Sequence, residues 1–541
     1  MTAAVSVNIA ERLRATAARN PEGVAMVFIK EGRKTTFREL DADCDRVAAG
    51  LKAHGLTPGM RVGVLVPPGP DFFAAAFGLF RLGAVPVLID PGLGRKAFGR
   101  CLTEASPEAF IGIPLAHAAR LAFGWAPSAR LKVVVGSIGY PGAPTLDRVR
   151  GLGAPGPFAA APTQAHDVAA ILFTSGSTGA PKGAVYTHGN FSAQVDLLKE
   201  RFSIEPGEVD LATFPLFGLF DPALGMTAVI PDMDFTRPGS VVPRNIIGPV
   251  LEYGVTNLFG SPALLDRVSR AAPKTRLPSV KRVLSAGAPV SPGVLVRTSE
   301  MLTGGALVHT PYGATEALPV CAIDSEEVLD ETADGTKRGL GTCVGLPLSG
   351  VEVSLIKVTD APVPEWSESL RAAPGDVGEI LVRGPQVTRS YHARPEADAL
   401  AKVRFPDGSV GHRMGDLGRF DEKGRLWFCG RKSQRVETSK GPLYTDCVEG
   451  IFNAHPKVRR SALVGLGERG AQRPYVVVEP EPGHWKSENL RGELLDLAAL
   501  NEVTKCVADV LFHASLPVDI RHNAKIQREQ LALWAAKELK Q

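Results

Sequence analysis

The sequence predicts an α/β protein with a large N-terminal domain and a small C-terminal domain, and three observations lead to this prediction. Short, almost continuous apolar runs recur along the first part of the chain, as in parallel strands that helices cover on both faces. After Gly350 the runs become shorter and are separated by Pro, Gly and Asp turns, which indicates a β-rich subdomain. A chain of 541 residues is also too long for a single hydrophobic core.

The earliest clear pattern in the chain is a β-α-β unit. Arg61–Val66 reads as a strand, Asp71 can cap a helix that runs to Leu82, and Val85–Ile89 reads as the next strand. A crossover of this kind joins parallel strands. The same alternation predicts further strands at Lys132–Val135, Val168–Phe173, Asn257–Phe259, Val283–Ser285 and Ala306–His309.

The last part of the chain has a different pattern. Gly430-Arg431-Lys432 predicts a hinge, so we expect a large domain of residues 1–430 and a mobile α+β lid of residues 431–541. The strands expected in the β-rich subdomain before the hinge are Val351–Ile356, Val377–Arg383 and Arg425–Phe428. The lid is expected to contain helices near Cys447–Asn453 and Asn501–Leu511 and strands near Arg460–Val464 and Tyr475–Glu479.

The composition excludes several classes of protein. The net charge of +4 is small for this length, which argues against a protein that binds nucleic acid by neutralising phosphates. The long apolar stretches Phe72–Ile89 and Leu211–Ile230 are interrupted by charged residues or prolines, so no membrane span is expected. Seven Cys occur singly, and Met1–Arg12 lacks the pattern of a secretory signal. We therefore expect a cytoplasmic protein without disulfides or a zinc site.

The run Ile171–Gly183 gives the strongest functional signal in the sequence. It reads ILFTSGSTGAPKG, an apolar segment that leads into a loop of Gly, Ser and Thr and ends in Pro-Lys-Gly. Glycine lets backbone N–H groups approach an anion, while hydroxyls add donors and lysine adds positive charge. We predict a polyphosphate cradle rather than a flexible linker, and its binding residues would be Thr174, Ser175, Gly176, Ser177, Thr178, Gly179 and Lys182.

Two later segments supply groups suited to the rest of a nucleotide. The small residues of Leu284–Pro289, which reads LSAGAP, would let a flat base lie against the backbone at Gly287, Ala288 and Pro289. His309–Glu316 reads HTPYGATE and offers an aromatic face, close backbone approach, a hydroxyl for a phosphate and a carboxylate for Mg²⁺. These four groups belong to Tyr312, Gly313, Thr315 and Glu316.

These motifs together resemble the acyl-adenylate-forming superfamily, which contains acyl-CoA synthetases, adenylation domains of peptide synthetases and luciferases. The resemblance continues through Arg413–Asp416, Gly430–Lys432 and Arg521–Ile526, in the family's order, although Met414 and Ala524 replace the usual Thr and Gly. It implies an enzyme that uses ATP and Mg²⁺ to convert a carboxylic acid into acyl-AMP. By the same resemblance Asp416 binds the ribose, Arg431 lies near it, Lys432 is the pivot of the hinge, and Lys525 bridges the attacking carboxylate and the α-phosphate.

The sequence departs from common CoA ligases at two places. Gly218 stands where those enzymes carry a His, and Lys440 replaces a Gly along which the pantetheine arm of CoA would pass. The segments Thr213–Pro243, Gly254–Leu265 and Arg338–Gly345 resemble the β-lactone synthetases of bacterial long-chain olefin biosynthesis. That resemblance implies a 2-alkyl-3-hydroxy fatty acid, whose own β-hydroxyl attacks the acyl-AMP and closes a β-lactone.

The acid would occupy a deep apolar pocket. Its predicted walls are Phe217, Gly218, Phe220, Leu258, Phe259 and Gly260, although any of these can equally belong to the core. A base for the β-hydroxyl would assist the second step, and His188 and Asp221 lie on segments expected to reach the pocket. His188 can alternatively cap the helix that follows it. The predicted catalytic set is Lys525, Lys182, Thr315, Glu316 and His188.

Other interpretations of the sequence remain open at this stage. One is a long-chain fatty-acyl-CoA synthetase or fatty-acyl-AMP ligase, which would need a second substrate to release the acyl group. Another is an inactive nucleotide-binding or scaffolding protein, although Glu316, Asp416 and Lys525 are all present. The olefin resemblance also implies partners, namely a thiolase-like condensing enzyme, a short-chain reductase and a β-lactone decarboxylase, with a possible complex among them.

Overall fold

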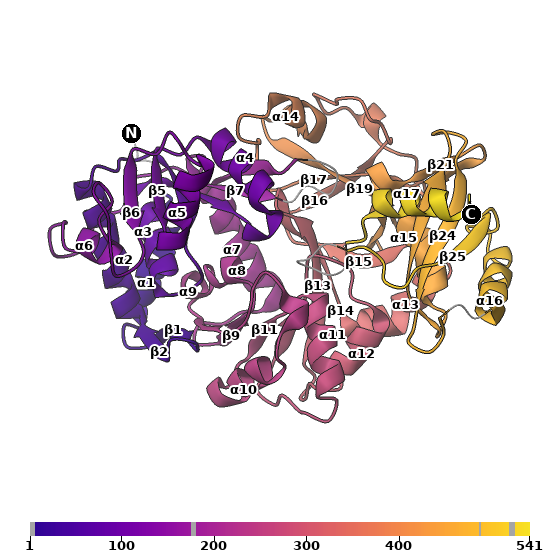
Figure 1. Cartoon of the computed structure of the whole chain (residues 1–541), viewed down its shortest axis with the longest axis horizontal. Helices are drawn as coiled ribbons and strands as arrows, with labels where there is room; N and C mark the ends of the chain where they lie inside the picture. The colour runs from indigo at the N-terminus through magenta and orange to yellow at the C-terminus, as the bar shows by residue number, and fades with distance from the viewer. Residues whose placement is uncertain (1–5, 175–179, 486–487, 519–524, 541) are drawn as a thin grey trace.

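The structure is a computed structural model that describes residues 6–174, 180–485, 488–518 and 525–540. It confirms the α/β fold class. The large N-terminal part lies at one end of an elongated molecule, and the C-terminal part that begins near Arg431 lies at the other (Figure 1).

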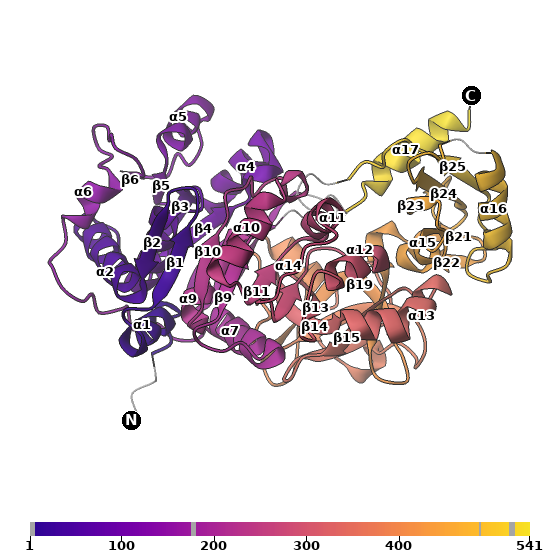
Figure 2. The same cartoon turned by 90° about the horizontal axis from the view of Figure 1, so that it is seen from below.

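One sheet of the N-terminal part carries the predicted β-α-β units. Its strands are parallel except for the antiparallel pair β7–β8, and helices cover both of its faces (Figure 2). The order across the sheet is β6 (Leu131–Val134), β5 (Ala109–Gly112), β3 (Arg61–Leu65), β4 (Val85–Ile89), β7 (Val168–Thr174) and β8 (Lys182–Thr187).

A second, longer sheet joins the remaining α/β region to the β-rich subdomain. It is parallel from β1 to β13 apart from its edge strand β2, and antiparallel from β13 onward. Its order is β2 (Arg33–Thr36), β1 (Val24–Phe28), β10 (Thr227–Ile230), β9 (Val209–Ala212), β11 (Asn257–Phe259), β12 (Arg282–Leu284), β13 (Leu307–Ala314), β14 (Ala317–Asp324), β15 (Thr342–Pro347), β20 (Leu426–Arg431), β19 (Val410–Phe420), β17 (Gly378–Arg383) and β16 (Glu352–Ile356), with β18 (Lys402–Arg404) beside β19.

Helices fill the space between and around these sheets. α3 is apolar on all sides and almost completely buried, since it packs between the first sheet and α2. The helices of the large part are α1 (Ala10–Arg19), α2 (Phe37–Ala53), α3 (Pro70–Leu82), α4 (Arg95–Ala105), α5 (Pro114–Phe123), α6 (Leu146–Arg150), α7 (His188–Phe202), α8 (Pro215–Gly218), α9 (Asp221–Leu224), α10 (Arg244–Tyr253), α11 (Pro262–Ala271), α12 (Pro292–Ser299), α13 (Ala333–Lys337) and α14 (Pro395–Ala401).

The C-terminal part has its own sheet and cores. β23 (Val458–Leu466) pairs antiparallel with β24 (Arg473–Pro480), which pairs parallel with β25 (Asp509–Phe512). The hairpin of β21 (Val436–Thr438) and β22 (Gly441–Leu443) lies beside them, and separate apolar clusters fill this part. Its helices are α15 (Thr445–Asn453), α16 (Glu488–Ala499) and α17 (Arg528–Glu538).

Two local predictions were wrong. The expected helix at Asn501–Leu511 is a turn followed by β25, because the apolar residues Val510 and Phe512 pair with β24 and close the small sheet. Asp71 does not cap α3; Pro70 takes the first helical position, which suits its fixed φ and missing N–H, and Gly69 becomes the N-cap.

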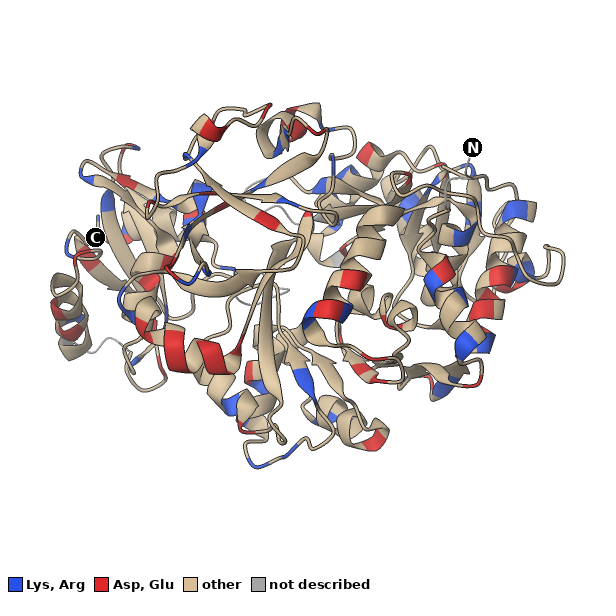
Figure 3. Cartoon of the chain, turned by 180° about the vertical axis from the view of Figure 1, so that it is seen from behind, with Lys and Arg blue, Asp and Glu red and all other residues tan. Residues whose placement is uncertain are grey.

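Charged residues and cysteines are distributed over both parts of the molecule. Basic and acidic residues are interspersed along the helices of both parts (Figure 3). The seven cysteines are free thiols, and six of them are buried. Within the described ranges, no helix combines the length and apolar character that a membrane crossing requires.

Candidate active site

A cavity of about 1520 Å³ lies where the two large sheets and the C-terminal part meet. This volume exceeds the roughly 300–1,000 Å³ of typical small-molecule pockets. Polar residues from the predicted motifs line one end of the cavity, and aromatic and aliphatic residues line the other. Predicted site residues on its wall are Lys182, Gly287, Gly313, Thr315, Glu316, Arg431, Lys432 and Lys525, together with Phe217, Phe220 and Phe259.

The predicted phosphate loop connects two strands at this cavity. β7 ends at Thr174 and β8 begins at Lys182, so the lysine side chain is presented at the edge of the sheet. Lys182 Nζ lies 5.1 Å from the centre of the Tyr391 ring, a cation–π contact. The predicted loop residues Ser175, Gly176, Ser177, Thr178 and Gly179 lie outside the described residues.

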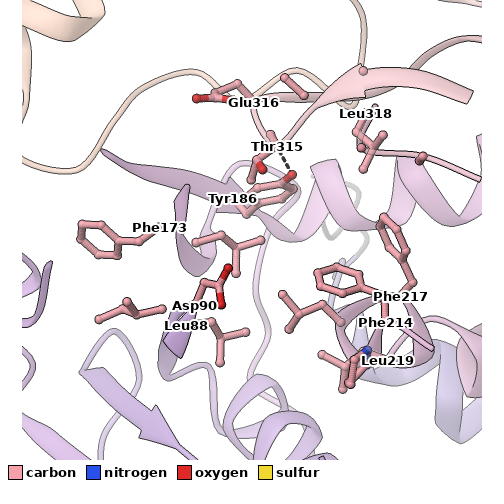
Figure 4. A pocket seen from close by; sticks show the side chains of 18 of the residues that line it. Leu88, Asp90, Phe173, Tyr186, Phe214, Phe217, Leu219, Thr315, Glu316 and Leu318 are labelled. Atoms are coloured by element: carbon pink, nitrogen blue, oxygen red, sulfur yellow. Dashed lines mark hydrogen bonds between the residues drawn. The ribbon is translucent and has the colours of Figure 1, made fainter. Parts of the chain in front are cut away.

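Thr315 and Glu316 lie in the tight connection between β13 and β14. The Tyr186 hydroxyl donates a hydrogen bond to the Thr315 carbonyl, which fixes this turn against β8 (Figure 4). The Tyr391 hydroxyl donates to Glu316 Oε1 at 2.7 Å. Tyr391 therefore contacts both a predicted metal-binding carboxylate and a predicted phosphate-binding lysine.

A second lysine that the sequence did not suggest lies behind Tyr391. Lys402 is only 7% exposed; its Nζ lies 5.3 Å from the Tyr391 ring centre and donates to the Thr388 carbonyl at 2.5 Å. Burial lowers the pKa of Lys402 to about 8, while the nearby Glu316 carboxylate opposes that change. A lysine within the sequence DALAKVRF gives no hint of this position, because only the pairing of β18 with β19 brings it there.

The predicted ribose residues Asp416 and Arg431 form a polar group with Tyr312, the residue predicted to stack on the base. Tyr312 donates its hydroxyl to Asp416 Oδ2 at 2.6 Å, and Arg431 Nη1 lies 2.8 Å from Asp416 Oδ1. Burial raises the pKa of Asp416, and the Arg431 guanidinium and the Tyr312 hydrogen bond counteract it. The contact arises because Asp416 on β19 and Arg431 on β20 are direct partners in the sheet.

Lys525 reaches the same cavity from the C-terminal part. It lines the wall, and its charge acts to lower the pKa of Asp416. The structure therefore brings together Lys182, Thr315, Glu316, Asp416 and Lys525, which are separated by more than 300 residues of sequence.

The segment after β12 contributes only in part. Gly287 lines the cavity and has a φ of +96°, a conformation that favours glycine. Ala288 and Pro289 follow it but do not line the cavity.

Lys432, the predicted pivot of the hinge, donates to the Thr359 carbonyl at 2.9 Å and to Glu379 Oε2 at 3.0 Å.

The apolar end of the cavity has an aromatic wall. The Phe217 ring packs edge-on against Phe259 at 4.7 Å and against Phe214 at 5.0 Å. Figure 4 shows Phe214, Phe217 and Leu219 on one side of the cavity and Leu88 and Phe173 on the other. Both sheets thus contribute to the apolar end.

Three of the predicted acyl-pocket residues do not line the cavity. Side chains alternate along β11, so Asn257 and Phe259 face the cavity whereas Leu258 points into the core on the opposite face. Gly218 and Gly260 lie behind the wall, against Ala212 and Leu265. The alternation along β11 can be recognised in the sequence, and it should have led to Asn257 instead of Leu258 as a residue of the cavity wall.

His188 does not reach the cavity wall. Thr187 caps α7 through its side chain, which leaves His188 as the first helical residue and turns it toward α1. Its Nδ1 accepts the Ile9 N–H at 3.2 Å, and burial lowers its pKa to about 4. In this position His188 is a neutral residue that ties the N-terminal segment to α7.

The residues present fit a single Mg²⁺ held partly by substrate. Among the residues that the structure describes, no group of three or more His, Cys, Asp or Glu is arranged around a common point. Mg²⁺ is commonly bound by one or two carboxylates together with substrate phosphates, and the Glu316 carboxylate on the cavity wall fits that mode.

Known proteins resemble this chain over most of its length. Olefin beta-lactone synthetase of Stenotrophomonas maltophilia is 50% identical, with 98% of each chain covered. The enzyme of the same name from Xanthomonas campestris pv. campestris is 52% identical over 93% of this chain and 91% of its own. The crystal structure of ATP-bound MatB from Rhodopseudomonas palustris superposes with a TM-score of 0.80 at 23% identity, covering 98% and 99%, so it shows the fold. The family model described as AMP-binding enzyme matches residues 13–392, and the chain therefore belongs to the family of AMP-binding enzymes.

Proposed function

We propose that this chain is an ATP-dependent β-lactone synthetase that acts on a long-chain 2-alkyl-3-hydroxy fatty acid in olefin biosynthesis. The observation that carries the proposal is the 50% identity to an olefin beta-lactone synthetase over 98% of both chains. The cavity supports it, because one continuous space joins the polar motif residues to an aromatic and aliphatic wall.

The first step makes a mixed anhydride. A carboxylate oxygen of the acid attacks the α-phosphorus of ATP while the bond to pyrophosphate breaks, and acyl-AMP forms. We propose that Lys182 and Lys525 stabilise the negative charge that develops on the phosphates, since both line the cavity. Thr315 donates its hydroxyl to a phosphate. Glu316 would hold Mg²⁺, and the ion would offset phosphate charge.

The nucleotide is held by the surrounding motif residues. We assign the base to Gly287, Ala288, Pro289 and the Tyr312 ring, and the ribose to the Asp416 carboxylate beside Arg431. Asp416 suits this task because a carboxylate can accept hydrogen bonds from two hydroxyls. The fixed Arg431 and Tyr312 contacts hold it in place before the nucleotide arrives.

The second step closes the ring without another substrate. The β-hydroxyl oxygen attacks the acyl carbonyl carbon, the bond from that carbon to the AMP oxygen breaks, and AMP leaves with the electron pair. The hydroxyl proton is released, so the products are the β-lactone and AMP. A strained ring can form because the anhydride is already activated and the two reacting groups are held in one molecule.

We propose that residues 431–541 turn about Lys432 between the two steps. In the described arrangement Asp360 of the large part pairs with Arg435 at 3.2 Å and with Arg469 at 2.8 Å. The Asp360–Arg469 pair is exposed and costs little to break, because surface pairs contribute only about 0–1 kcal/mol each. A rotation of this kind would withdraw Lys525 once acyl-AMP has formed.

An incubation without CoA tests the proposed function. Purified protein is mixed with ATP, Mg²⁺ and a 2-alkyl-3-hydroxy fatty acid, and products are analysed by mass spectrometry. The expected products are AMP, pyrophosphate and the lactone. If the acid turns over only after CoA is added, the chain is an acyl-CoA synthetase instead; if free acyl-AMP accumulates without lactone, it is an acyl-AMP ligase. The proposed complex with a β-lactone decarboxylase and a short-chain reductase needs a separate pull-down.

A further inference from the structure

Three buried polar residues lie together on the wall of the cavity, at its largely apolar end. Asp210 lies within β9, Asn257 begins β11 directly opposite it in the sheet, and Asp221 begins α9. They are 3%, 4% and 6% exposed, and all three line the cavity. Their neighbours on the wall include the apolar residues Leu198, Ile204, Phe217, Leu224, Met226 and Phe259.

The three side chains form a hydrogen-bonded cluster. Asn257 Nδ2 donates to Asp210 Oδ1, and the Asp210 and Asp221 carboxyl groups hydrogen bond to each other. Burial raises the pKa of Asp210 to about 7 and raises the pKa of Asp221 well above its usual range. Asp221 is therefore the protonated member, and it donates its proton to Asp210.

The described cation that acts on this pair is already engaged by another carboxylate. It is Arg282, whose Nη2 donates to Glu208 Oε1 at 3.1 Å and whose Nη1 also pairs with Glu208. Arg282 is thus neutralised by its own partner. The carboxyl pair stays neutral or singly charged inside an apolar wall.

Within the described part of the chain, no N–H or hydroxyl group donates to Asp221 Oδ2 or to Asn257 Oδ1, and both atoms are buried. Since Asp221 gives its proton to Asp210 and Asn257 gives its amide N–H, the oxygen that keeps no proton on Asp221 and the amide Oδ1 of Asn257 are acceptors. Buried acceptors without a donor cost free energy, and a ligand that supplies donors would remove that cost.

Gly218, which is not on the cavity wall, lies beside one of these acceptors. A Cβ added to Gly218 would lie 3.7 Å from Asp221 Oδ2, an ordinary van der Waals contact, and 3.0 Å from the Ala212 Cβ. This is the position at which the sequence lacks the His of common CoA ligases.

We propose that Asp221, held by Asp210 and Asn257, forms a subsite that accepts a hydrogen bond from a hydroxyl group on the acyl chain. The cluster rejects an anionic group, because its remaining atoms are acceptors. It also disfavours an ammonium group, because an apolar wall desolvates a cation at high cost. The inference rests on the proposed function in one respect: the β-hydroxyl of a 2-alkyl-3-hydroxy acid is the hydroxyl that this function supplies.

The test compares two variants of Asp221 that have a similar size but differ in their ability to form hydrogen bonds. Asp221→Asn keeps an acceptor oxygen and a donor toward Asp210, whereas Asp221→Leu has a similar size and neither group. Each protein is assayed for pyrophosphate release with three acids: the 2-alkyl-3-hydroxy acid, its deoxy analogue, and an isomer with the hydroxyl farther along the chain. The readout is the ratio of kcat/KM for each hydroxy acid to that for the deoxy acid.

The wild type and Asp221→Asn should prefer the 3-hydroxy acid, and Asp221→Leu should lose at least about 10-fold of that preference with little change for the deoxy acid. A preference for the other isomer would retain the subsite but assign it to a hydroxyl deeper in the pocket. Equal losses with all three acids would overturn the subsite and leave the cluster a structural role. A loss in Asp221→Asn as large as in Asp221→Leu would overturn the acceptor role in favour of an ionised base.

A second variant covers the case in which Asp221→Leu does not fold. Asn257→Leu has a similar size but removes the amide oxygen and the donor to Asp210, so it should also reduce the preference for the hydroxy acid. An unchanged preference in a folded Asn257→Leu protein contradicts the subsite. Failure of the proposed function is a separate outcome, because the wild type would then show the preference for the hydroxyl without producing lactone.

Discussion

The carboxyl groups at the nucleotide end of the cavity lie near lysine and arginine side chains, whereas the two at the acyl end hydrogen bond to each other and to an amide. Asp416 lies 2.8 Å from Arg431, and Glu316 contacts Tyr391, which lies between Lys182 and Lys402. Asp210 and Asp221 share a hydrogen bond and a neighbouring amide. One end of the pocket is therefore suited to charged phosphates, and the other end is suited to a neutral polar group.

This difference shows that the groups around a buried carboxyl group determine whether it is ionised. Burial raises the pKa of Asp416, Asp210 and Asp221, and a guanidinium 2.8 Å away opposes that change at Asp416. At the acyl end, hydrogen bonds within the cluster lower the pKa of Asp210 less than burial raises it, so the pair holds a proton. The following changes are ordered by the size of the effect that this contrast predicts.

Removing the positive charge that the C-terminal part brings to the nucleotide end should have the largest effect. Lys525→Ala should slow acid-dependent pyrophosphate exchange by about 100- to 1000-fold, the usual cost of losing one group that stabilises transition-state charge. Thermal unfolding should be unchanged. Lys537→Ala, an exposed lysine on α17, is the matched control. Normal exchange in Lys525→Ala would remove this residue from the mechanism.

Adjacent residues of β11 should separate stability from specificity. Leu258→Ala leaves a cavity in the core and should lower the free energy of unfolding by about 2–5 kcal/mol while the preference among acids stays the same. Phe259→Ala removes an aromatic wall and should shift the preferred acid toward bulkier chains. Chemical denaturation and a panel of acids measure the two effects. A change of acid preference in Leu258→Ala would contradict the assignment of the two faces.

Tyr391→Phe should have a moderate effect confined to the nucleotide end. The variant keeps the ring under Lys182 and Lys402 but loses the hydrogen bond to Glu316, which is worth about 1.5–3 kcal/mol for a charged acceptor. The expected result is a roughly 10-fold higher Mg²⁺ concentration for half-maximal pyrophosphate exchange. Mg²⁺-dependent nucleotide binding, followed by calorimetry, should weaken in parallel. An unchanged Mg²⁺ requirement would mean that Tyr391 does not position Glu316.

The smallest effect concerns the pH dependence of stability. The pKa of Asp210 is raised from 3.8 to about 7 in the folded protein, so the folded state keeps a proton that the unfolded state releases. The stabilisation from this group is present below the unfolded pKa and disappears as pH rises toward 7. Asp210→Asn cannot ionise, so its Tm relative to wild type should rise between pH 4 and 7 and then level off. A constant difference would show that Asp210 is ionised throughout.

Sequence reasoning was most successful where chemistry lies in a continuous motif. Thr315, Glu316, Asp416 and Lys525 each stand within a short recognisable run, and the structure brings their side chains or segments to one cavity. The strand-helix alternation likewise predicted most strands of the first sheet to within one residue. Such motifs are local, so a single sequence is enough to recognise them.

The rest depends on contacts that the chain makes only after folding. Asp210 and Asn257 look like isolated polar residues in apolar strands until the register of β9 and β11 places them opposite each other. Tyr391 and Lys402 reach Glu316 through the β18–β19 pairing and a loop that carries no motif. The missed strand β25 has the same cause, since its partner β24 decides its conformation.

Isotope transfer tests the central claim most directly, because that claim assigns adenylation to the carboxylate and ring closure to the hydroxyl. A 2-alkyl-3-hydroxy acid labelled with ¹⁸O in both carboxylate oxygens is converted with ATP, and AMP and product are weighed by mass spectrometry. The account predicts one heavy oxygen in AMP and one in the lactone carbonyl, with the unlabelled hydroxyl oxygen in the ring. Unlabelled AMP together with a doubly labelled lactone would show that the hydroxyl is activated instead, and would contradict the account.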